Sequence, residues 1–251
     1  MSVPEAIAIV AAGVAAGTIN AVVGSGTLFT FPVLIAFGVP PVTANVSNNI
    51  GLVPGSITGV TGYRRELAGQ RPRVVRFAPM SSLGSVTGAA LLLVLPSSAF
   101  KEIVPFFIAL ALILIVIQPR LGPRLARMRV EGHTAEHPGW VRPVIFIAGI
   151  YGGYFGAAQG IMLIAILSLA LDDQLQRTNA LKNVLSLVVN ATAGVIFVFS
   201  APVDWGIAGL IAAGSIVGGV IGSRYGRRLS PGALRVVIVV VGTSAIVRLL
   251  A

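Results

Sequence analysis

The sequence predicts an all-α, polytopic integral membrane protein. Of the 251 residues, 55% are hydrophobic and only 10% are charged, whereas soluble domains have about 25% charged residues. Charges are absent from long continuous stretches, each of which could hold at least one membrane span. Continuous apolar runs favour helices over a β-barrel, whose strands alternate polar and apolar residues. The charge-free stretches are 6–63, 77–100, 103–119, 143–171, 183–203 and 205–223, and the apolar stretch 233–250 contains only Arg235 and Arg248.

The net charge and the missing residue types limit the function. The formal net charge is +10 at pH 7, which nucleic-acid binding could explain, but cytoplasmic loops of polytopic proteins are also rich in Lys and Arg. We therefore expect the lipid bilayer as a partner and no nucleic acid. The chain has no cysteine, and the predicted spans contain no Asp, Glu or His. Without a nucleophile, base or metal ligand in the membrane, we predict no enzyme, no metal site and no cofactor.

The two halves of the sequence resemble each other. Three segments recur in the same order, which indicates a duplicated unit. We predict a first transmembrane repeat over 1–119, a charged cytoplasmic linker over 120–142 and a second repeat over 143–251. The recurring segments begin at Gly17 and Gly149, at Thr43 and Arg177, and at Ser81 and Ala212.

Each repeat opens with an apolar run that is too long for one span. A helix over 6–37 would be about 48 Å long at 1.5 Å per residue, against a hydrocarbon core of about 30 Å. Glycine tolerates the backbone geometry of a break, so we place the breaks at Gly24-Ser25-Gly26 and between Gly156 and Gly160. Each run is interpreted as a broken-helix hairpin, followed by three transmembrane helices. Re-entrant hairpins and pairs of tilted short spans remain alternatives.

The distribution of Lys and Arg supports hairpins that return to their own side. With two such hairpins, all but two of the 18 Lys and Arg residues lie in cytoplasmic loops, the exceptions being Lys101 and Arg248. If the second run crossed the membrane once instead, the Lys and Arg residues would be divided more evenly between the two sides, contrary to the positive-inside rule. The two repeats are therefore predicted to be inverted, with both termini outside.

The breaks and the helix after each hairpin carry the candidate binding residues. Inverted repeats with broken helices are typical of transporters, and helix N-termini near the midplane suit an anion. The alternatives are close helix packing for the glycines, interhelical hydrogen bonds for the asparagines, and snorkelling for Lys182. The candidate substrate-binding residues are Asn20, Gly24, Ser25, Gly26, Thr27, Asn45, Asn48, Asn49, Gln159, Asn179, Lys182 and Asn183.

Glycines at helical spacing form two further faces, one with Gly84 and Gly88 and one with Gly214, Gly218 and Gly222. Small residues at this spacing let membrane helices approach closely. We assign both faces to helix packing and not to chemistry. The same faces could also form the contact of a homodimer.

The segments "NAVVGSGTLFTFPVLIAFGVPP", "NVSNN" and "VDWGIAGLIAAGSIVGGVIGSRYGRRLS", with the internal repetition of the first two, resemble the sulfite exporter TauE/SafE family over nearly the whole chain. The resemblance implies transport of small sulfur-containing anions, such as sulfite, thiosulfate or an organosulfonate, across the bacterial cytoplasmic (inner) membrane. An interior-negative potential expels anions, so we expect export without obligatory proton coupling. The alternatives are an uptake carrier for the same anions and a structural membrane assembly partner without transport.

Overall fold

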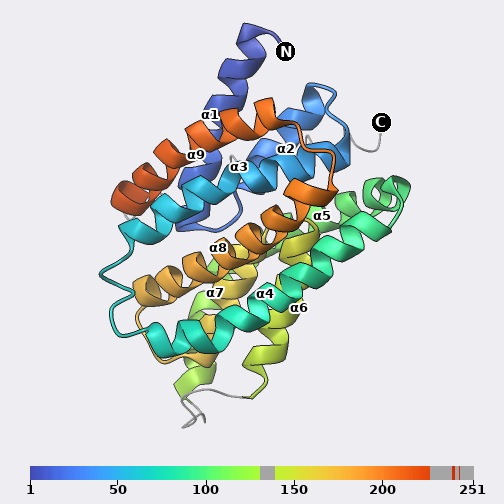
Figure 1. Cartoon of the computed structure of the whole chain (residues 1–251). Helices are drawn as coiled ribbons and strands as arrows, with labels where there is room; N and C mark the ends of the chain where they lie inside the picture. Colours follow the sequence, from blue (N-terminus) through green and yellow to red (C-terminus); the bar gives the residue numbers. More distant parts are fainter. Residues whose placement is uncertain (131–138, 227–238, 241–242, 244–251) are drawn as a thin grey trace.

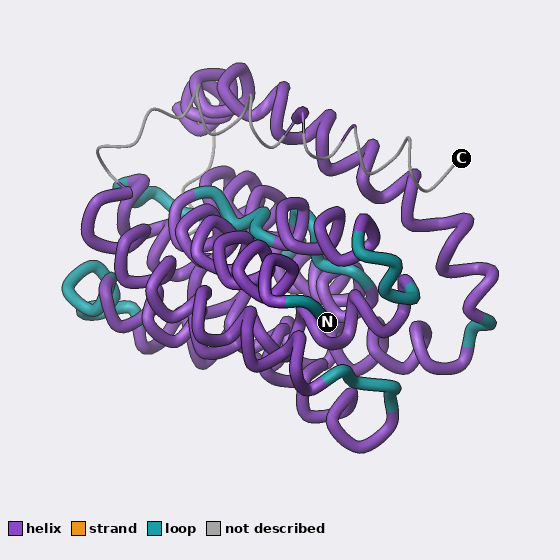
Figure 2. Tube along the Cα trace, turned by 90° about the horizontal axis from the view of Figure 1, so that it is seen from above, coloured by secondary structure: helices purple, strands orange, loops and turns teal. Residues whose placement is uncertain are grey.

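The computed structural model describes residues 1–130, 139–226, 239–240 and 243, and within them the chain is helical, with loops only between helices (Figures 1 and 2). The all-α prediction is thereby confirmed. Five helices, α1, α4, α5, α8 and α9, include segments long and apolar enough to cross a membrane. The helices are α1 (Val3–Val22), α2 (Thr27–Ala36), α3 (Pro41–Gly62), α4 (Arg71–Val94), α5 (Ser97–Val130), α6 (Val141–Tyr154), α7 (Gln159–Ala170), α8 (Leu175–Ser200) and α9 (Trp205–Tyr225).

Two predicted segments fall partly outside this description. The last span predicted for the second repeat, 233–250, lies outside the described residues except for 239, 240 and 243. Helix α5 continues to Val130, so the segment predicted as a linker begins inside a helix.

Both predicted helix breaks are present. Helix α1 ends at Val22 before α2 begins at Thr27, and α6 ends at Tyr154 before α7 begins at Gln159. With 10 and 12 residues, α2 and α7 are about 15 and 18 Å long at 1.5 Å per residue. Neither helix alone can cross a hydrocarbon core of about 30 Å.

The two breaks have the same backbone geometry. In the first, the N–H groups of Val23 and Gly24 both donate to the carbonyl of Ile19, at 2.7 and 2.9 Å. In the second, the N–H of Gly156 donates in the same way to the carbonyl of Tyr151 at 3.0 Å. Gly24 has φ +87° and Gly156 has φ +74°, in the left-handed region that side chains disfavour. The sequence forms this turn because glycine stands at both positions.

One helix of each hairpin packs on the other half of the chain. Helix α1 lies along α9, since Gly214 is against Val10 and Gly222 is against Thr18. The Thr18 hydroxyl also donates to the carbonyl of Gly218 at 3.1 Å. Residue numbers rise together along this contact, so α1 and α9 run in the same direction.

Helices α4 and α6 form the corresponding pair, with Gly84 against Phe146 and Gly88 against Ile150. These two helices also run in the same direction. Both glycine faces therefore pack within the chain, as predicted, and they give no support to a homodimer.

The first helices of the two hairpins run in opposite directions. Helix α3 runs with α9, because Gly51 lies against Ile211 and Gly62 against Ser223. Helix α4 returns antiparallel to α3 after a short turn (Figure 1). Helices α1, α3 and α9 thus point one way, and α4 and α6 point the other way.

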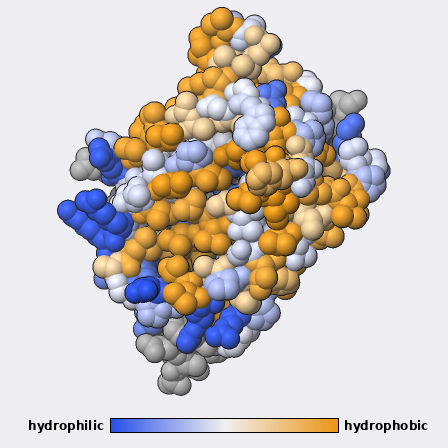
Figure 3. Space-filling view, viewed as in Figure 1, coloured by the Kyte–Doolittle hydropathy of each residue, from blue (hydrophilic) through white to orange (hydrophobic). Residues whose placement is uncertain are grey.

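Hydrophilic atoms gather at one end of the bundle, whereas apolar side chains cover much of the visible flank (Figure 3). The turn between α3 and α4 lies at this end, and Arg64, Arg65, Arg71 and Arg76 are exposed there. This is the end that the sequence predicts to face the cytoplasm.

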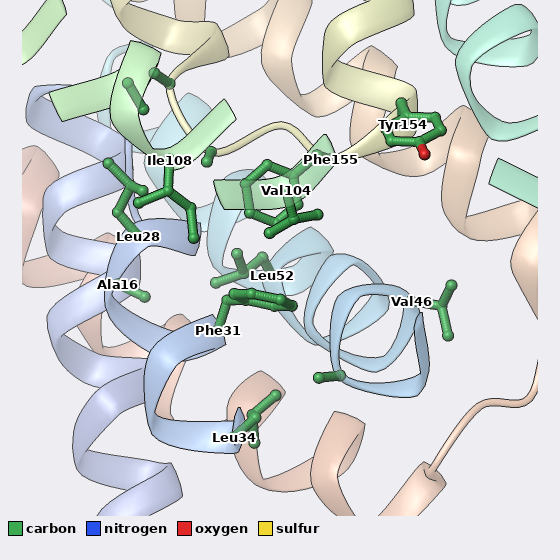
Figure 4. Packing of buried hydrophobic residues seen from close by; sticks show 14 of the residues in the cluster. Ala16, Leu28, Phe31, Leu34, Val46, Leu52, Val104, Ile108, Tyr154 and Phe155 are labelled. Atoms are coloured by element: carbon green, nitrogen blue, oxygen red, sulfur yellow. The ribbon is translucent and has the colours of Figure 1, made fainter. Parts of the chain in front are cut away.

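Aromatic side chains hold the two hairpins together (Figure 4). The ring of Phe155, in the second break, lies edge-on to Phe31 of α2 with centroids 5.1 Å apart. Phe100 and Phe107 of α5 lie within 6.4 Å of Phe155. This buried cluster closes the space beside the second break against α2 and α5.

Candidate functional site

The two helix breaks meet in space. The N–H of Gly160 donates to the carbonyl of Gly24 at 3.1 Å. A Cβ atom on Gly24 would lie 2.5 Å from the Cα of Gly160, closer than packed atoms approach. Glycine at these positions therefore serves both interpretations drawn from the sequence, the break itself and close backbone packing.

A pocket opens beside this contact. It has about 440 Å³ of empty space, including its open mouth, and receives residues from both breaks, from α3 and from the middle of α8. Among the described residues, no charged side chain lines the pocket. The lining residues are Asn20, Ala21, Gly24, Thr27, Ser56, Gly59, Gly156, Gln159, Gly160, Asn183, Ser186 and Asn190.

Five of the candidate residues line this pocket, namely Asn20, Gly24, Thr27, Gln159 and Asn183. The others stand behind the lining or beside it, where most of them bond the elements that form the pocket. They are Ser25, Gly26, Asn45, Asn48, Asn49, Asn179 and Lys182.

In the first break, polar side chains bond to the chain itself. The side-chain oxygen of Asn20 accepts from the N–H of Gly26 at 2.7 Å, so Asn20 caps the beginning of α2 while it lines the pocket. The Thr27 hydroxyl accepts from the amide of Asn48 at 3.2 Å. Ser25 is buried, and its hydroxyl has no hydrogen-bond partner among the described residues.

The α3 asparagines bond to other helices. The amide of Asn45 donates to the carbonyl of Tyr154 at the end of α6, at 2.9 Å. Asn48 also accepts from the Thr30 hydroxyl of α2, and the amide of Asn49 donates to Asn190 of α8 at 3.4 Å. Interhelical hydrogen bonding, one of the alternatives from the sequence, accounts for these three side chains.

Three α8 side chains donate to the last carbonyls of α1. The amides of Asn179 and Asn183 reach the carbonyl of Ala21 at 3.1 and 3.2 Å. The ammonium group of Lys182 reaches the carbonyl of Asn20 at 2.9 Å. Lys182 is completely buried, with 0% of its surface exposed, so it does not snorkel to the membrane surface.

In the second break, Gln159 begins α7 and lines the pocket. Only 3% of its surface is exposed, and its side-chain nitrogen has no hydrogen-bond partner among the described residues. Its carboxamide lies against Gly152, the residue that aligns with Asn20 when Gly24 and Gly156 are superposed. Gln159 thus occupies the space that the Asn20 side chain takes in the first half.

Ser56, Ser186 and Asn190 line the pocket but were not among the candidate residues. The sequence contains a signal for two of them, because Asn183, Ser186 and Asn190 share one helix face at intervals of three and four. Which of these polar residues face the pocket depends on the rotation of α8 against the two breaks.

Comparison with known proteins agrees with this architecture. The family model described as sulfite exporter TauE/SafE matches residues 9–249. The chain belongs to the sulfite exporter TauE/SafE family. It is therefore a membrane transporter with several membrane-spanning helices, and not an enzyme.

Curated proteins named as probable membrane transporters are similar to the chain along most of their length. A probable membrane transporter protein, ORF9, of Sinorhizobium sp. is 27% identical over 238 residues, 94% of this chain and 88% of the relative. The probable membrane transporter protein YfcA of Escherichia coli K12 is 25% identical over 240 residues, 94% and 86% of the two chains. A probable membrane transporter protein of Haemophilus influenzae is 27% identical over 213 residues, 84% and 81%. No solved structure matches the chain.

Proposed function

We propose that this protein moves small sulfur-containing anions, such as sulfite, thiosulfate or an organosulfonate, across the bacterial cytoplasmic (inner) membrane. The pocket between the two breaks binds the anion. The observation that carries this proposal is that Thr27 and Gln159, the first residues of α2 and α7, line the same pocket. Each helix N-terminus carries roughly half a positive charge, and two of them favour an anion between them. The family description supplies the sulfur chemistry.

Gln159 provides an independent indication of a ligand. Its side-chain nitrogen is a buried donor without a partner among the described residues, and a donor left unsatisfied away from water is costly. A sulfur oxyanion in the pocket would accept this hydrogen bond. The other polar lining side chains are neutral amides and hydroxyls, which can hold an anion and still release it, as transport requires.

Inverted repeats would supply the conformational change that transport requires. Two observations support the repeat relation predicted from the sequence. Helices α1 and α6 run in opposite directions, and each packs on a helix of the other half, α1 on α9 and α6 on α4. In such transporters, one repeat rocks against the other around a site near the midplane. We keep the prediction that both termini lie outside.

Export is the direction that we propose. The predicted spans contain no Asp, Glu or His for a proton relay, and an interior-negative potential favours anion exit by about 2.3 kcal/mol per charge per 100 mV. Uptake of the same anions and a structural assembly role without transport are the competing functions.

Flux of sulfite, thiosulfate and sulfoacetate from proteoliposomes tests the proposal, with the voltage set by a potassium gradient and valinomycin. We expect voltage-driven anion efflux that is lost in Gln159→Leu and kept in Thr87→Val. The control removes the hydroxyl of a half-buried threonine, which donates to the carbonyl of Leu83 within its own helix. Absence of flux for all three anions would refute the proposed substrate class. Unchanged flux in Gln159→Leu would refute the proposed binding site. A requirement for a pH gradient without any voltage effect would refute uncoupled export.

A further inference from the structure

Each broken helix brings two opposite partial charges to the pocket. Helices α2 and α7 begin there with their N-termini, and α1 and α6 end beside them with carbonyl groups. The ends carry roughly +0.5 and −0.5 of an elementary charge respectively. The attraction of the two N-termini for an anion is therefore cancelled unless the carbonyl ends are neutralised.

At the end of α1, this neutralisation comes from α8. The Lys182 ammonium group donates to the carbonyl of Asn20 at 2.9 Å, and the amides of Asn179 and Asn183 donate to the carbonyl of Ala21. The two carbonyls belong to pocket-lining residues. Lys182 is the member of this set whose side chain can carry a full charge.

The charge of Lys182 is uncompensated by any carboxylate in its surroundings. Its side chain is completely buried, it forms no ion pair within the described part of the chain, and no acidic residue lines the pocket. An isolated buried ammonium group is costly, and a helix C-terminus is the partner that a cation prefers. When Lys182 is protonated, its charge offsets the two carbonyl ends, so the pocket wall keeps the positive charge that the two helix N-termini supply.

The other hairpin lacks this charge. The carbonyl of Tyr154, at the end of α6, accepts from the neutral amide of Asn45 at 2.9 Å. Asn48 aligns with Lys182 when "NVSNN" is placed on "NALKN", and it bonds to the hydroxyls of Thr27 and Thr30 instead of a carbonyl. One full charge thus separates two sites that are otherwise built alike.

We propose that Lys182 is a positioning residue that sets the sign of the solute that the pocket accepts. It acts through the carbonyl end of α1, which it neutralises, and not as a direct ligand of the anion. This inference rests on the proposed function. It predicts that the contribution of Lys182 grows with the charge of the anion, because electrostatic energy is proportional to that charge.

Two neutral variants and one charged variant test the inference. Lys182→Gln keeps a donor for the carbonyl of Asn20 but removes the charge, and Lys182→Asn introduces the residue that the first half has at this position. Lys182→Arg keeps the charge. Dissociation constants for methanesulfonate, a monoanion, and thiosulfate, a dianion, are measured on purified protein in detergent at constant ionic strength.

We expect the neutral variants to bind methanesulfonate roughly 10-fold and thiosulfate roughly 100-fold more weakly than the unmodified protein. Lys182→Arg should stay near the unmodified affinity for both. Arg76→Gln removes an exposed charge that is not part of the described pocket lining and should change neither constant. Unfolding temperatures without anion verify that each variant is folded.

Equal weakening for the two anions would overturn the inference, because it would mean that Lys182 acts only as a structural hydrogen-bond donor. Unchanged affinity in a folded neutral variant would overturn it as well. If neither neutral variant folds, the test is the ratio of the thiosulfate and methanesulfonate affinities. The same ratio in Lys182→Arg and in the unmodified protein supports the inference. Loss of the preference for thiosulfate in Lys182→Arg contradicts the inference. If the unmodified protein binds and transports no sulfur anion, the proposed function fails, a result distinct from all of these.

Discussion

The first and second helix breaks share a backbone and differ in their side chains. Gly24 and Gly156 adopt the same left-handed turn, yet the side chain of Asn20 is bonded to its own hairpin. Gln159 instead has a side-chain donor at the pocket without a partner in the described part of the chain. The comparison teaches that one backbone turn can carry side chains with different partners. The first break is bonded within its own hairpin, and the second has the donor that we propose for the ligand.

The largest expected effect is that of a side chain at the contact between the breaks. Gly24→Ala would force a Cβ against the Gly160 backbone and strain a positive φ, and we expect a loss of about 3 kcal/mol or more in stability, with loss of transport. Gly38 has φ +78° with nothing within 4 Å of its Cβ position. Gly38→Ala should therefore cost only the strain, about 1–2 kcal/mol. Thermal unfolding in detergent measures both, and equal effects would mean that the contact between the breaks is unimportant.

Next in size is the contrast between Asn20 and Gln159. Asn20→Leu leaves the buried N–H of Gly26 without its acceptor and should destabilise the protein by about 1–3 kcal/mol. Gln159→Leu removes a donor that has no partner among the described residues, so stability should be nearly unchanged while anion affinity falls by about 10-fold or more. Unfolding temperature and anion binding, measured on both variants, separate the two roles. Similar changes in the two variants would break the distinction between a supporting and a binding break.

A smaller difference is expected between Asn45 and Asn179, which each donate to a carbonyl at a helix end. Asn45→Leu removes the side-chain donor to Tyr154 and should cost about 1–3 kcal/mol, whereas Asn179→Leu should cost less than about 1 kcal/mol. The reason is that the amide of Asn183 also reaches the carbonyl of Ala21. Both variants should reduce flux in proteoliposomes, Asn45→Leu more strongly. Full flux in both would favour the assembly role over transport.

The smallest effect concerns the ion pairs of Asp173, at the end that the sequence predicts to face the cytoplasm. Partial burial by itself would raise the pKa of Asp173, but hydrogen bonds from Arg73, the N–H of Gln174 and Arg177 outweigh it, so the pKa lies below its usual range. A lowered folded-state pKa stabilises the protein above the unfolded-state pKa of about 3.9, and this stabilisation is lost as the pH falls through the folded value.

We therefore expect Asp173→Asn to lower stability by about 1 kcal/mol at pH 7, since the ion pairs are partly exposed. The difference from the unmodified protein should shrink as the pH falls below about 3.9. Unfolding temperatures between pH 3 and pH 7 measure it, with Glu102→Gln, which changes an exposed carboxylate, as the control. A difference that persists at the lowest pH would show that the ion pairs are not its cause.

The sequence alone determined the membrane class, the positions of the two breaks and the packing role of the glycine faces. These features are local, because apolar runs without charge, glycine at a turn and small residues at helical spacing each have one dominant physical consequence. The similarity of the two halves was equally visible, since "NVSNN" and "NALKN" stand in corresponding places.

Only the tertiary structure decided which polar side chains line the pocket and what the others hold. Helical spacing shows that Asn179, Lys182 and Asn183 lie on one side of α8, but not that this side meets the carbonyl end of α1, more than 150 positions away in the sequence. Likewise, Asn20 and Gln159 look equivalent as polar residues at a break, and the difference between them depends on the space that Gly152 leaves. The rotation of each helix and the contact between distant segments depend on packing across the whole bundle, and a periodic pattern within one segment does not contain that information.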